Sequence, residues 1–473
     1  MFLENDNILD QDTKPLQSVY FLGIGGIGMS ALARYYNSRH IKVSGYDKTP
    51  TPLTDTLMQE GIKVHFEDSV ELLDKDADFV VYTPAIPKDH QELKFYRDNR
   101  YQLRKRSEVL GSITRSHFNI CVAGTHGKTT TSTMIAHLLR HTGYGCNAFL
   151  GGIAANYNTN FWLAPIQSDS GNIEVSVAEA DEYDRSFLQL TPDIAIITAM
   201  DADHLDIYGN EKNMQDAFVE FAAKIKTGGF LIFKKGIPRT DDFIVSNKLD
   251  YDVQDSSADA YATNIRITNG SYLFDAVIKN KIIKDVQLNM GGMHNLENAI
   301  ASIAVAIQLD IEEEKIKNAI ADFKGVKRRF EYVVKNQAGN GTVMIDDYAH
   351  HPEELRALIF GAKGLFPTKK TTVVFQPHLF SRTSDLADGF AEVLSMCDET
   401  ILLPIYPARE LPMPGVTSNL ILDKMTNKKK SLKEKGELLT WVKENDTELL
   451  IICGAGDIDA LVEPIKNILN SKS

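Results

Sequence analysis

The sequence has few cysteines and no excess of positive charge. Cys121, Cys146, Cys397 and Cys453 lie far apart and lack the spacing of a metal site, so we expect buried thiols in a reducing cytoplasm. The formal net charge is −13 at pH 7, which argues against nucleic acid as the main partner. Disulfide-rich secreted proteins and general nucleic-acid-binding proteins are therefore disfavoured.

The sequence also lacks a long apolar run and a signal sequence. No stretch reaches the length needed to cross a bilayer, and residues 1–14 are polar and acidic. Of the 473 residues, 43% are hydrophobic and 24% are charged, as in water-soluble globular proteins. We expect a cytoplasmic protein of several domains with no membrane partner.

The most specific signal is the stretch 123–130, here called the second loop. It follows an apolar run, 118–122, that predicts a buried strand, and it precedes residues 132–140, which have helical apolar spacing. A strand, a glycine-rich turn and a helix together point backbone N–H groups at a phosphate. Lys128 would add a positive charge there, and the Thr129 hydroxyl is placed to bind Mg²⁺.

The second loop departs from the ordinary Walker A spacing, because Val122 stands where that pattern has its first glycine. A glycine turn with a surface lysine is the plain alternative. The order of strand, glycines, lysine, threonine and helix favours a phosphate-binding loop. Its residues are Gly124, Thr125, His126, Gly127, Lys128, Thr129 and Thr130.

An earlier glycine-rich stretch, 23–28, is here called the first loop. It follows a short apolar strand, 18–22, and precedes a helix-like run, 29–37. The glycines fit G-x-G-x-x-G, and Asp47 ends a further strand about 20 residues on, as in dinucleotide-binding folds. This pattern predicts a phosphate-bearing ligand without identifying it, so a nicotinamide-dependent dehydrogenase stays open.

The whole chain alternates strand-like and helix-like segments, which predicts an α/β protein with mostly parallel sheets. We expect a flexible segment at 1–17, followed by three domains. Their predicted bounds are 18–112, 113–325 and 326–473.

Acidic residues and a histidine end two predicted strands of the middle domain. Glu179 and His204 stand at such ends, where ligands bind in open α/β sheets. With the Thr129 hydroxyl they offer a partial Mg²⁺ site that nucleotide phosphates would complete. For His204 alone a structural role is the plain alternative. The cluster of Glu179, Asp181 and Glu182 would repel itself unless a cation, or Arg185, lies among its members.

A basic set marks the last domain. Arg329 and Arg382 come from different segments and could hold a phosphoryl group or a substrate carboxylate, although exposed cations on an acidic protein are the plain alternative. Asp346 and Asp347 follow a strand and could hold a substrate amine. We expect Asp347 rather than Asp346 to face the cleft, although strand alternation does not decide between them.

Together these motifs resemble the Mur ligases of bacterial cell-wall synthesis. The resemblance spans nearly the whole chain past residue 17, with the motifs in the family's order. It implies an N-terminal Rossmann-like domain that binds UDP, a central P-loop ATPase and a C-terminal Rossmann-like domain. The matching segments are residues 23–30, 123–130, 179–182, 203–204, 294–298, 328–330, 346–352 and 376–378.

The resemblance also implies a role for each matching residue. At ATP it adds His294, Asn295, Asn298 and Arg329 to the second loop, and it gives Mg²⁺ the ligands Thr129, Glu179 and His204. At the UDP-sugar it implies Gly23, Gly25, Gly26, Ile27, Gly28, Met29, Ser30, Asp47, Thr83 and Ala85. At the amino acid it implies Asp347, Tyr348, His350, His378 and Arg382. The implied catalytic residues are Lys128, His204, Arg329, His350 and Arg382.

Two departures from the family pattern bear on these roles. Leu379 stands where many relatives have an arginine, so any contact through that side chain is absent. Residues 217–219 read Ala-Phe-Val, where several sister ligases have a modified lysine. The second departure agrees with the alanine-adding branch of the family.

That branch implies an ATP-dependent ligase of peptidoglycan precursor synthesis. It joins L-alanine to the lactyl carboxylate of UDP-N-acetylmuramate through an acyl phosphate, and we expect a monomer or a weak homodimer. The first loop, Gly-Ile-Gly-Gly-Ile-Gly-Met-Ser, favours this branch over the ligase that recycles a tripeptide. A dehydrogenase would leave the second loop unexplained, and a non-enzymatic nucleotide switch would leave the first unexplained.

Overall fold

The computed structural model describes residues 15–164, 174–202, 204–268, 270–335, 341–408 and 410–472. The chain divides into two compact units. Unit 1 holds the chain up to residue 153 together with 158–260 and 301–316, and unit 2 holds 154–157, 261–300 and 317 onward. Across the described ranges, no helix is both long enough and apolar enough to span a membrane.

Unit 1 begins with a five-stranded parallel sheet in the order β3-β2-β1-β4-β5. Its strands are β1 (Ser18–Leu22), β2 (Lys42–Tyr46), β3 (Lys63–His65), β4 (Phe79–Tyr82) and β5 (Leu103–Lys105). Its helices are α1 (Ile27–Ser38), α2 (Pro52–Gln59), α3 (Gln91–Asp98) and α4 (Arg106–Thr114).

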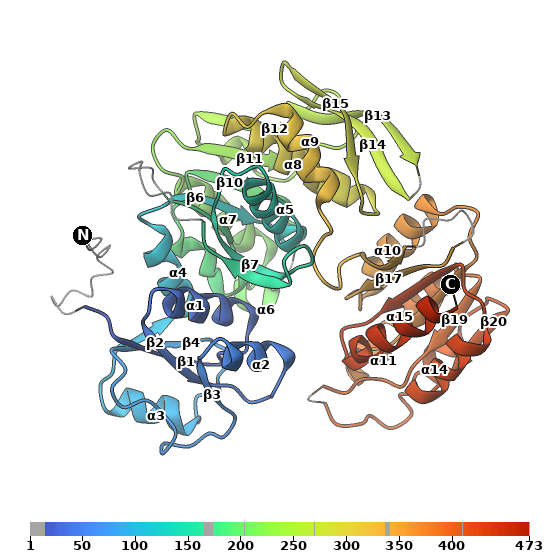
Figure 1. Cartoon of the computed structure of the whole chain (residues 1–473), viewed down its shortest axis with the longest axis horizontal. Coiled ribbons are helices and arrows are strands. Elements are labelled where there is room, and N and C mark those ends of the chain that lie inside the picture. Colours follow the sequence, from blue (N-terminus) through green and yellow to red (C-terminus); the bar gives the residue numbers. More distant parts are fainter. Residues whose placement is uncertain are drawn as a thin grey trace. The chain divides into compact units, whose positions relative to one another are not determined.

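Alternation along β1 separates two cores in this sheet. Val19 and Phe21 belong to the hydrophobic cluster that contains residues of α1, whereas Tyr20 and Leu22 belong to the cluster of α3. Successive side chains of a strand point to opposite faces, so α1 and α3 cover opposite faces of the sheet (Figure 1). This two-sided covering explains the apolar runs of the central strands β1 and β4.

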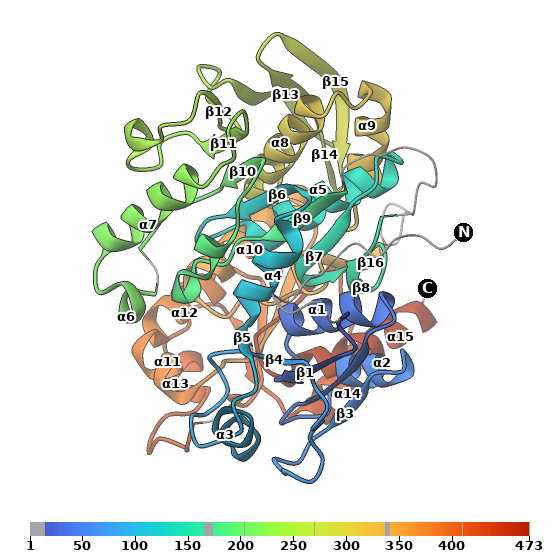
Figure 2. The ribbon, with the colours of Figure 1, turned by 90° about the vertical axis from the view of Figure 1, so that its left-hand side faces the viewer.

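Unit 1 also holds seven consecutive strands of a ten-stranded sheet, in the order β12-β11-β10-β6-β9-β7-β8 (Figure 2). The strands are β6 (Phe118–Ala123), β7 (Asn147–Ala154), β8 (Thr159–Trp162), β9 (Val175–Glu179), β10 (Ile194–Ile197), β11 (Phe230–Lys234) and β12 (Asn247–Tyr251). The helices are α5 (Lys128–His141), α6 (Leu205–Tyr208) and α7 (Glu211–Ala223). Because β10, β6 and β9 are parallel neighbours, their C-terminal ends meet at one edge.

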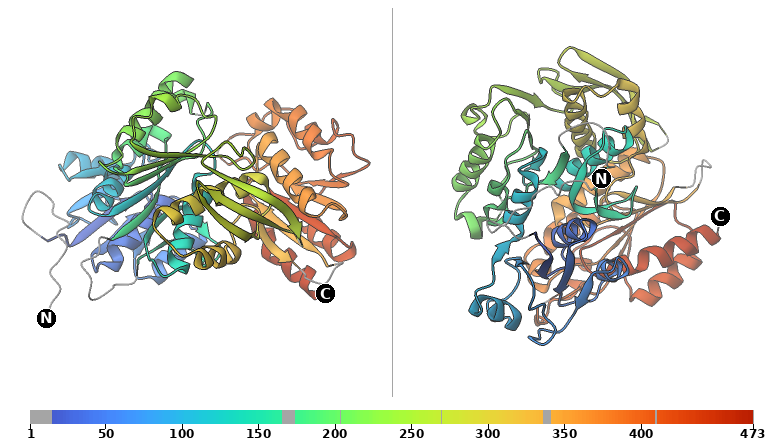
Figure 3. Two further views of the ribbon diagram at one scale, coloured as in Figure 1. Left: turned by 90° about the horizontal axis from the view of Figure 1, so that it is seen from above. Right: turned by 60° about the vertical axis from the view of Figure 1, so that its left-hand side comes forward.

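Unit 2 contains an antiparallel hairpin, visible in yellow-green in Figure 3, and a six-stranded sheet in the order β16-β17-β21-β18-β19-β20. The hairpin region has β13 (Ala260–Thr268), β14 (Ser271–Ile278) and β15 (Lys281–Leu288). The helices α8 (Met293–Gln308) and α9 (Glu313–Asp322) follow in the chain, and the end of α8 and the start of α9 belong to unit 1. The sheet has β16 (Glu331–Lys335), β17 (Val343–Asp347), β18 (Thr371–Phe375), β19 (Glu399–Leu402), β20 (Lys429–Leu432) and β21 (Leu449–Cys453). Its helices are α10 (Pro352–Leu365), α11 (Phe380–Asp385), α12 (Ala387–Leu394), α13 (Asn419–Leu422), α14 (Lys435–Glu444) and α15 (Val462–Ser471).

The structure confirms the α/β class and the buried thiols, since all four cysteines are free and buried. Residues 155–158 form the turn between β7 and β8. The helical segment after β18 is interrupted at Leu386, where φ is −114° and ψ is 14°, and this residue separates α11 from α12. Of the segment 1–17, which we expected to be flexible, residues 1–14 lie outside the described residues, and the three domain bounds stay predictions.

Candidate active site

The second loop joins β6 to α5 through two glycines with left-handed backbone. Gly124 has φ +135° and Gly127 has φ +83°. A Cβ at Gly124 would lie 2.7 Å from the backbone nitrogen of Ala199, so only glycine allows this approach. Gly127 precedes α5, and no side chain of the described residues caps the start of that helix. The first N–H groups of α5 are thus left for an anion.

Lys128 lies in the first turn of α5 and is held by two oxygen acceptors. Its ammonium donates to the carbonyl of Gly124 at 2.6 Å and to the carboxylate of Glu182 at 2.8 Å. Burial raises the pKa of Glu182, and the Lys128 ammonium opposes that rise. The ion pair therefore fixes the position of a cation that a phosphate at the loop would also attract.

The acidic cluster after β9 is balanced by cations, but Arg185 is not one of them. Arg185 pairs with Glu220 at 2.8 Å, while Lys128 pairs with Glu182. Arg106, from the start of α4, pairs with Asp181 at 3.2 Å. Sequence reasoning missed Glu182 and Arg106 as site residues, although the like charges of the cluster did require cations.

The metal candidates lie at one edge of the sheet of unit 1. Glu179 is the last residue of β9 and pairs in register with Val122 of β6, just before the second loop. Thr129 lies in the first turn of α5. His204 follows β10, has φ +50°, and its ring lies 5.2 Å from the ring of Tyr183. Its Nε2 is 3.9 Å from the carboxylate of Glu182.

These donors fit Mg²⁺ only as part of a ligand set. Among the described residues, no cluster of three His, Cys, Asp or Glu side chains has the arrangement of a complete metal site. Mg²⁺ prefers oxygen ligands and keeps several waters, so a hydroxyl and a carboxylate beside nucleotide phosphates would suffice. The Thr129 and Glu179 oxygens match that chemistry better than the His204 imidazole does.

The first loop joins β1 to α1, and its own carboxylate stabilises its backbone. The Asp47 carboxylate accepts from the N–H of Gly25 at 2.7 Å and from the N–H of Thr49 at 3.2 Å. Gly26 precedes α1, and no side chain of the described residues caps that helix either. The start of α1 therefore remains a candidate anion site, while Asp47 supports the loop from the side.

Arg106 lies directly against the first loop. A Cβ at Gly28 would lie 2.5 Å from the Arg106 guanidinium, so the guanidinium occupies the space that a side chain at this position would fill. The same guanidinium bonds to Asp181, the neighbour of Glu182. A cation thus stands beside the start of α1, as Lys128 stands at the start of α5.

The remaining predicted residues of the first loop support it from behind. Met29 is 2% exposed and Ser30 is fully buried. The Asn160 amide donates to the Ser30 hydroxyl at 3.0 Å and to the carbonyl of Ile27 at 2.6 Å, which ties α1 to β8. The Thr83 methyl faces Gly23, and the Thr83 hydroxyl accepts from the N–H of Ala85 at 3.5 Å.

Unit 2 brings together most of the residues predicted for the amino acid. Tyr348 and His350 follow β17, with ring centroids 5.2 Å apart, and His378 follows β18, 6.1 Å from His350. Arg382, on α11, has a guanidinium nitrogen 3.4 Å from His378 Nδ1. Burial lowers the pKa of both histidines, and the Arg382 charge acts in the same direction.

Leu379 contributes through its backbone. Its φ is +69°, and its N–H donates to the carbonyl of Tyr406 at 3.0 Å. The Tyr406 ring stacks on His378 at 5.8 Å. Leu379 therefore helps to place the start of α11, which carries Arg382.

The two aspartates at the end of β17 differ in their surroundings. Asp347 accepts from the N–H groups of Phe330 and Ala349, each at 2.7 Å, and burial raises its pKa to about 6. Asp346 is 2% exposed, and burial raises its pKa to about 7 against the pull of Arg328, 3.7 Å away. Arg328 also lies over the Tyr348 ring at 5.1 Å. Sequence reasoning considered Asp346 for the substrate amine but preferred Asp347, and it did not predict the pairing of Asp346 with Arg328, which lies 18 positions away.

The other residues predicted at the nucleotide are divided by exposure. Arg329 and His294 are exposed, whereas Asn295 and Asn298 are buried on α8. The Asn295 amide donates to the carbonyl of Gly291 at 2.6 Å, and the Asn298 amide donates to Asn295 at 3.4 Å. These two asparagines therefore order the start of α8.

Comparison with protein families gives three matches along the chain. They are the Mur ligase family, catalytic domain, at residues 18–118; the Mur ligase middle domain at 122–306; and the Mur ligase, glutamate ligase domain, at 328–456. The three matches leave few residues between 18 and 456 uncovered.

Curated relatives and solved structures agree with these matches. The chain is 47% identical over 459 residues to a UDP-N-acetylmuramate–L-alanine ligase of Flavobacterium johnsoniae, covering 96% of this chain and 98% of the relative. It is 48% identical over 467 residues to the ligase of the same name from Phocaeicola vulgatus, covering 98% and 100%. The crystal structure of UDP-N-acetylmuramate-alanine ligase from Thermotoga maritima matches with a TM-score of 0.81 and 27% identity over 96% of this chain and 100% of that one. A murein peptide ligase from Psychrobacter arcticus, at 22% identity and a TM-score of 0.66 over 96% and 98%, shares the fold.

Proposed function

The chain belongs to the Mur ligase family, and we propose that it joins L-alanine to UDP-N-acetylmuramate with the hydrolysis of ATP, in peptidoglycan precursor synthesis. The observation that carries this function is the near-full-length identity to L-alanine ligases, at 47–48%. The three-domain fold, with Rossmann-like N- and C-terminal domains around an ATP-binding domain, agrees with it. The matches do not support the alternative function that the first loop left open, a nicotinamide-dependent dehydrogenase.

The chemistry requires an activated carboxylate, because a carboxylate does not condense with an amine in water. Transfer of the γ-phosphoryl group of ATP to a carboxylate oxygen gives an acyl phosphate and ADP. The amine of L-alanine then attacks the carbonyl carbon, the amide C–N bond forms, and the C–O bond to phosphate breaks. Such steps depend mainly on positioning and on charge neutralisation.

The second loop is suited to the first step. Its two left-handed glycines and the uncapped start of α5 offer backbone N–H groups to phosphate oxygens, and Lys128 offers a positive charge. Glu182 holds the Lys128 ammonium before a nucleotide binds, at 2.8 Å. We assign the residues of this loop to ATP on that basis.

Thr129 and Glu179, with His204 nearby, are the residues that would hold Mg²⁺. The ion, when bound, would neutralise charge on the transferring phosphates. The fit rests on the oxygen donors at the C-terminal edge of β9 and at the start of α5.

The first loop and the cluster of unit 2 take the other two substrates. Arg106 and the start of α1 would bind the diphosphate of the nucleotide sugar, with Asp47 bracing the loop. His350, His378 and Arg382, with lowered histidine pKa values, present neutral imidazoles beside one fixed cation. Neutral imidazoles can accept a proton from an attacking amine. A cytoplasmic location fits the four free thiols, and a monomer or weak homodimer remains our prediction.

A phosphate-release assay tests the function. Release should require ATP, Mg²⁺ and UDP-N-acetylmuramate together, and among L-alanine, L-serine, glycine and a tripeptide it should be fastest with L-alanine. Release that is fastest with the tripeptide would assign the chain to the recycling branch. Release without any amine or nucleotide sugar would instead indicate a simple ATPase.

A further inference from the structure

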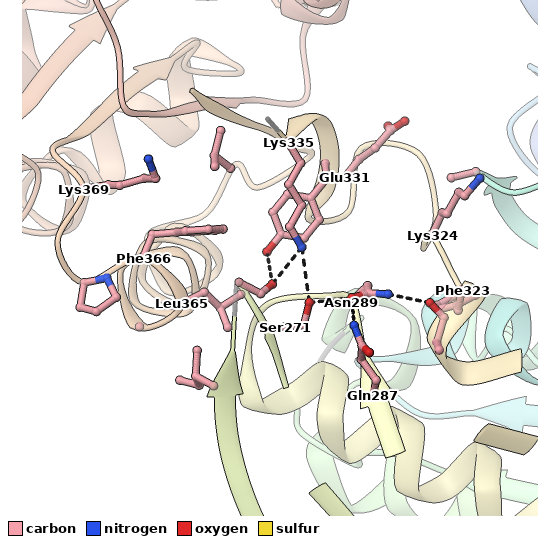
Figure 4. A pocket seen from close by; sticks show the side chains of 18 of the residues that line it. Ser271, Gln287, Asn289, Phe323, Lys324, Glu331, Lys335, Leu365, Phe366 and Lys369 are labelled. Carbon is pink, nitrogen blue, oxygen red and sulfur yellow. Dashed lines mark hydrogen bonds between the residues drawn. The ribbon is translucent and has the colours of Figure 1, made fainter. Parts of the chain in front are cut away.

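Unit 2 contains a cavity of about 1170 Å³ whose lining includes no residue of the two loops, the metal candidates or the histidine cluster. Its walls come from the start of β14, from β16 and from the segment that follows α10. Figure 4 shows Lys335 pointing from β16 toward Ser271, with Phe366 on one side. The cavity is large enough for a small organic ligand.

Lys335 is the central cation of this cavity, and it is held only by neutral groups. Its ammonium lies 3.4 Å from the carbonyl oxygen of Gly270 and 3.4 Å from the hydroxyl of Ser271. It also lies 4.6 Å from the centroid of the Tyr332 ring, whose hydroxyl donates to Gly270 at 3.0 Å. No carboxylate of the described ranges forms an ion pair with it.

The two carboxylates in the wall are engaged elsewhere. Glu331 accepts from the N–H of Arg328 at 2.9 Å, and Asp322 accepts from the Asn156 amide at 3.2 Å. Lys324 and Lys369 also line the cavity, so its lysines outnumber its carboxylates. The interior is therefore positive at Lys335.

A partly buried ammonium without a counter-ion is costly. Burial lowers the pKa of Lys335, which expresses that cost, and an anion placed beside the ammonium would relieve it. The rings of Tyr332 and Phe366 add apolar wall around the charge.

We propose that this cavity is a second ligand site, which binds a small carboxylate or phosphate anion at Lys335. The anion would contact the ammonium within the cavity that Lys335 lines. Because the site is built from both β14 and β16, its ligand would strengthen the contact between these two strands of unit 2. The proposal is independent of the ligase function.

Site-resolved protection of lysines tests the proposal on the full chain. The protein is acetylated with a neutral N-hydroxysuccinimide ester in the presence of inorganic phosphate, of citrate, or of sodium chloride at equal ionic strength. Each lysine is then quantified by peptide mass spectrometry. With phosphate or citrate at ten times its dissociation constant, acetylation of Lys335 should slow about tenfold relative to sodium chloride. Exposed Lys281 on β15 is the internal control and should not change.

The second loop also attracts phosphate, so the same experiment is run on Lys128→Ala. Protection of Lys335 should persist in that variant. The proposal is overturned if neither anion protects Lys335 beyond sodium chloride, if Lys281 is protected equally, or if protection disappears in Lys128→Ala. The stronger of the two anions distinguishes a carboxylate ligand from a phosphate ligand.

Discussion

The two glycine-rich loops of unit 1 share a local geometry but differ in the charge placed beside it. Both connect a buried parallel strand to a helix whose start is uncapped by any described side chain. At the first loop, Asp47 bonds to the backbone and Arg106 approaches from another helix. At the second, Lys128 belongs to the loop itself and is held by buried Glu182.

This difference separates binding from chemistry. The first loop has a rigid backbone and a borrowed cation, which suits a diphosphate that is bound but not broken. The second carries its own lysine, whose charge is held beside the start of α5, where it can stabilise a transferring phosphoryl group. Changes at the second loop should therefore reduce turnover, and changes at the first should reduce affinity for the nucleotide sugar.

The largest effect is expected from Lys128→Ala. Loss of this charge should reduce kcat by about 10²–10³-fold, while affinity for UDP-N-acetylmuramate stays at the wild-type value. Phosphate release and calorimetry measure the two quantities. Lys212→Ala, an exposed lysine on α7, is the matched control and should behave as wild type. Near-normal turnover in Lys128→Ala would end the assignment of the second loop.

Glu182→Gln should have the next largest effect. The amide still accepts a hydrogen bond from Lys128 but lacks the charge that holds the ammonium, so we expect kcat to fall about 10–100-fold. Glu220→Gln, which breaks the exposed pair with Arg185, is the control. An unchanged kcat in Glu182→Gln would mean that the ion pair has only a structural role.

Glu179→Gln should raise the Mg²⁺ concentration for half-maximal activity at least about tenfold, because one carboxylate ligand is lost. His204→Ala should give a smaller rise. Mg²⁺ titrations of phosphate release on both variants measure this. Equal Mg²⁺ dependence in both variants and wild type would contradict the metal assignment.

Arg106→Met should weaken binding of UDP-N-acetylmuramate, because a cation beside the start of α1 is lost. Since the Arg106 guanidinium is partly exposed, we expect a loss of only about fivefold in affinity, or about 1 kcal/mol. The KM for ATP should change little. Titration calorimetry and ATP kinetics compare the two. A larger change in the KM for ATP than in sugar affinity would invert the roles of the loops.

The smallest effect is expected in the pH dependence of the free energy of unfolding, through Glu92 on α3. Glu92 is fully buried and bonded to Tyr20 of β1, and burial raises its pKa to about 7. A raised folded pKa stabilises the protein below the unfolded pKa near 4.5, and this stabilisation is lost as pH rises to about 7. The free energy of unfolding should fall by at most about 1.4 kcal/mol per pH unit over that window from this group. Denaturant unfolding at several pH values should show that the free energy of unfolding depends less on pH in Glu92→Gln than in the wild type. The same pH dependence in both proteins would contradict this role of Glu92.

Local sequence was sufficient for the elements that carry the loops. The apolar runs before Gly23 and Gly124 predicted β1 and β6, and helical spacing predicted α1 and α5. The strands β7 and β8 were missed because glycine and asparagine in 151–160 resemble a loop. Tertiary pairing overrode that local signal.

The charge partners of the site could not be predicted, because they are distant in sequence. Glu182 lies 54 positions from Lys128, and Arg106 lies 75 positions from Asp181. The sequence indicated that the acidic cluster needs cations. The arginine nearest to the cluster in sequence, Arg185, pairs instead with Glu220. The partners of the Asp47, Ser30 and Asp346 side chains likewise come from separate segments of the chain.

Phosphoryl transfer to the carboxylate of the nucleotide sugar is the step on which the comparison of the loops depends, and an oxygen label follows it directly. UDP-N-acetylmuramate labelled with oxygen-18 in its carboxylate is turned over with ATP and L-alanine, and the released phosphate is analysed by mass spectrometry. An acyl phosphate places one labelled oxygen in each phosphate, since the C–O bond breaks when the amine attacks. Phosphate free of label would show that ATP does not activate this carboxylate and would contradict the division of work between the two loops.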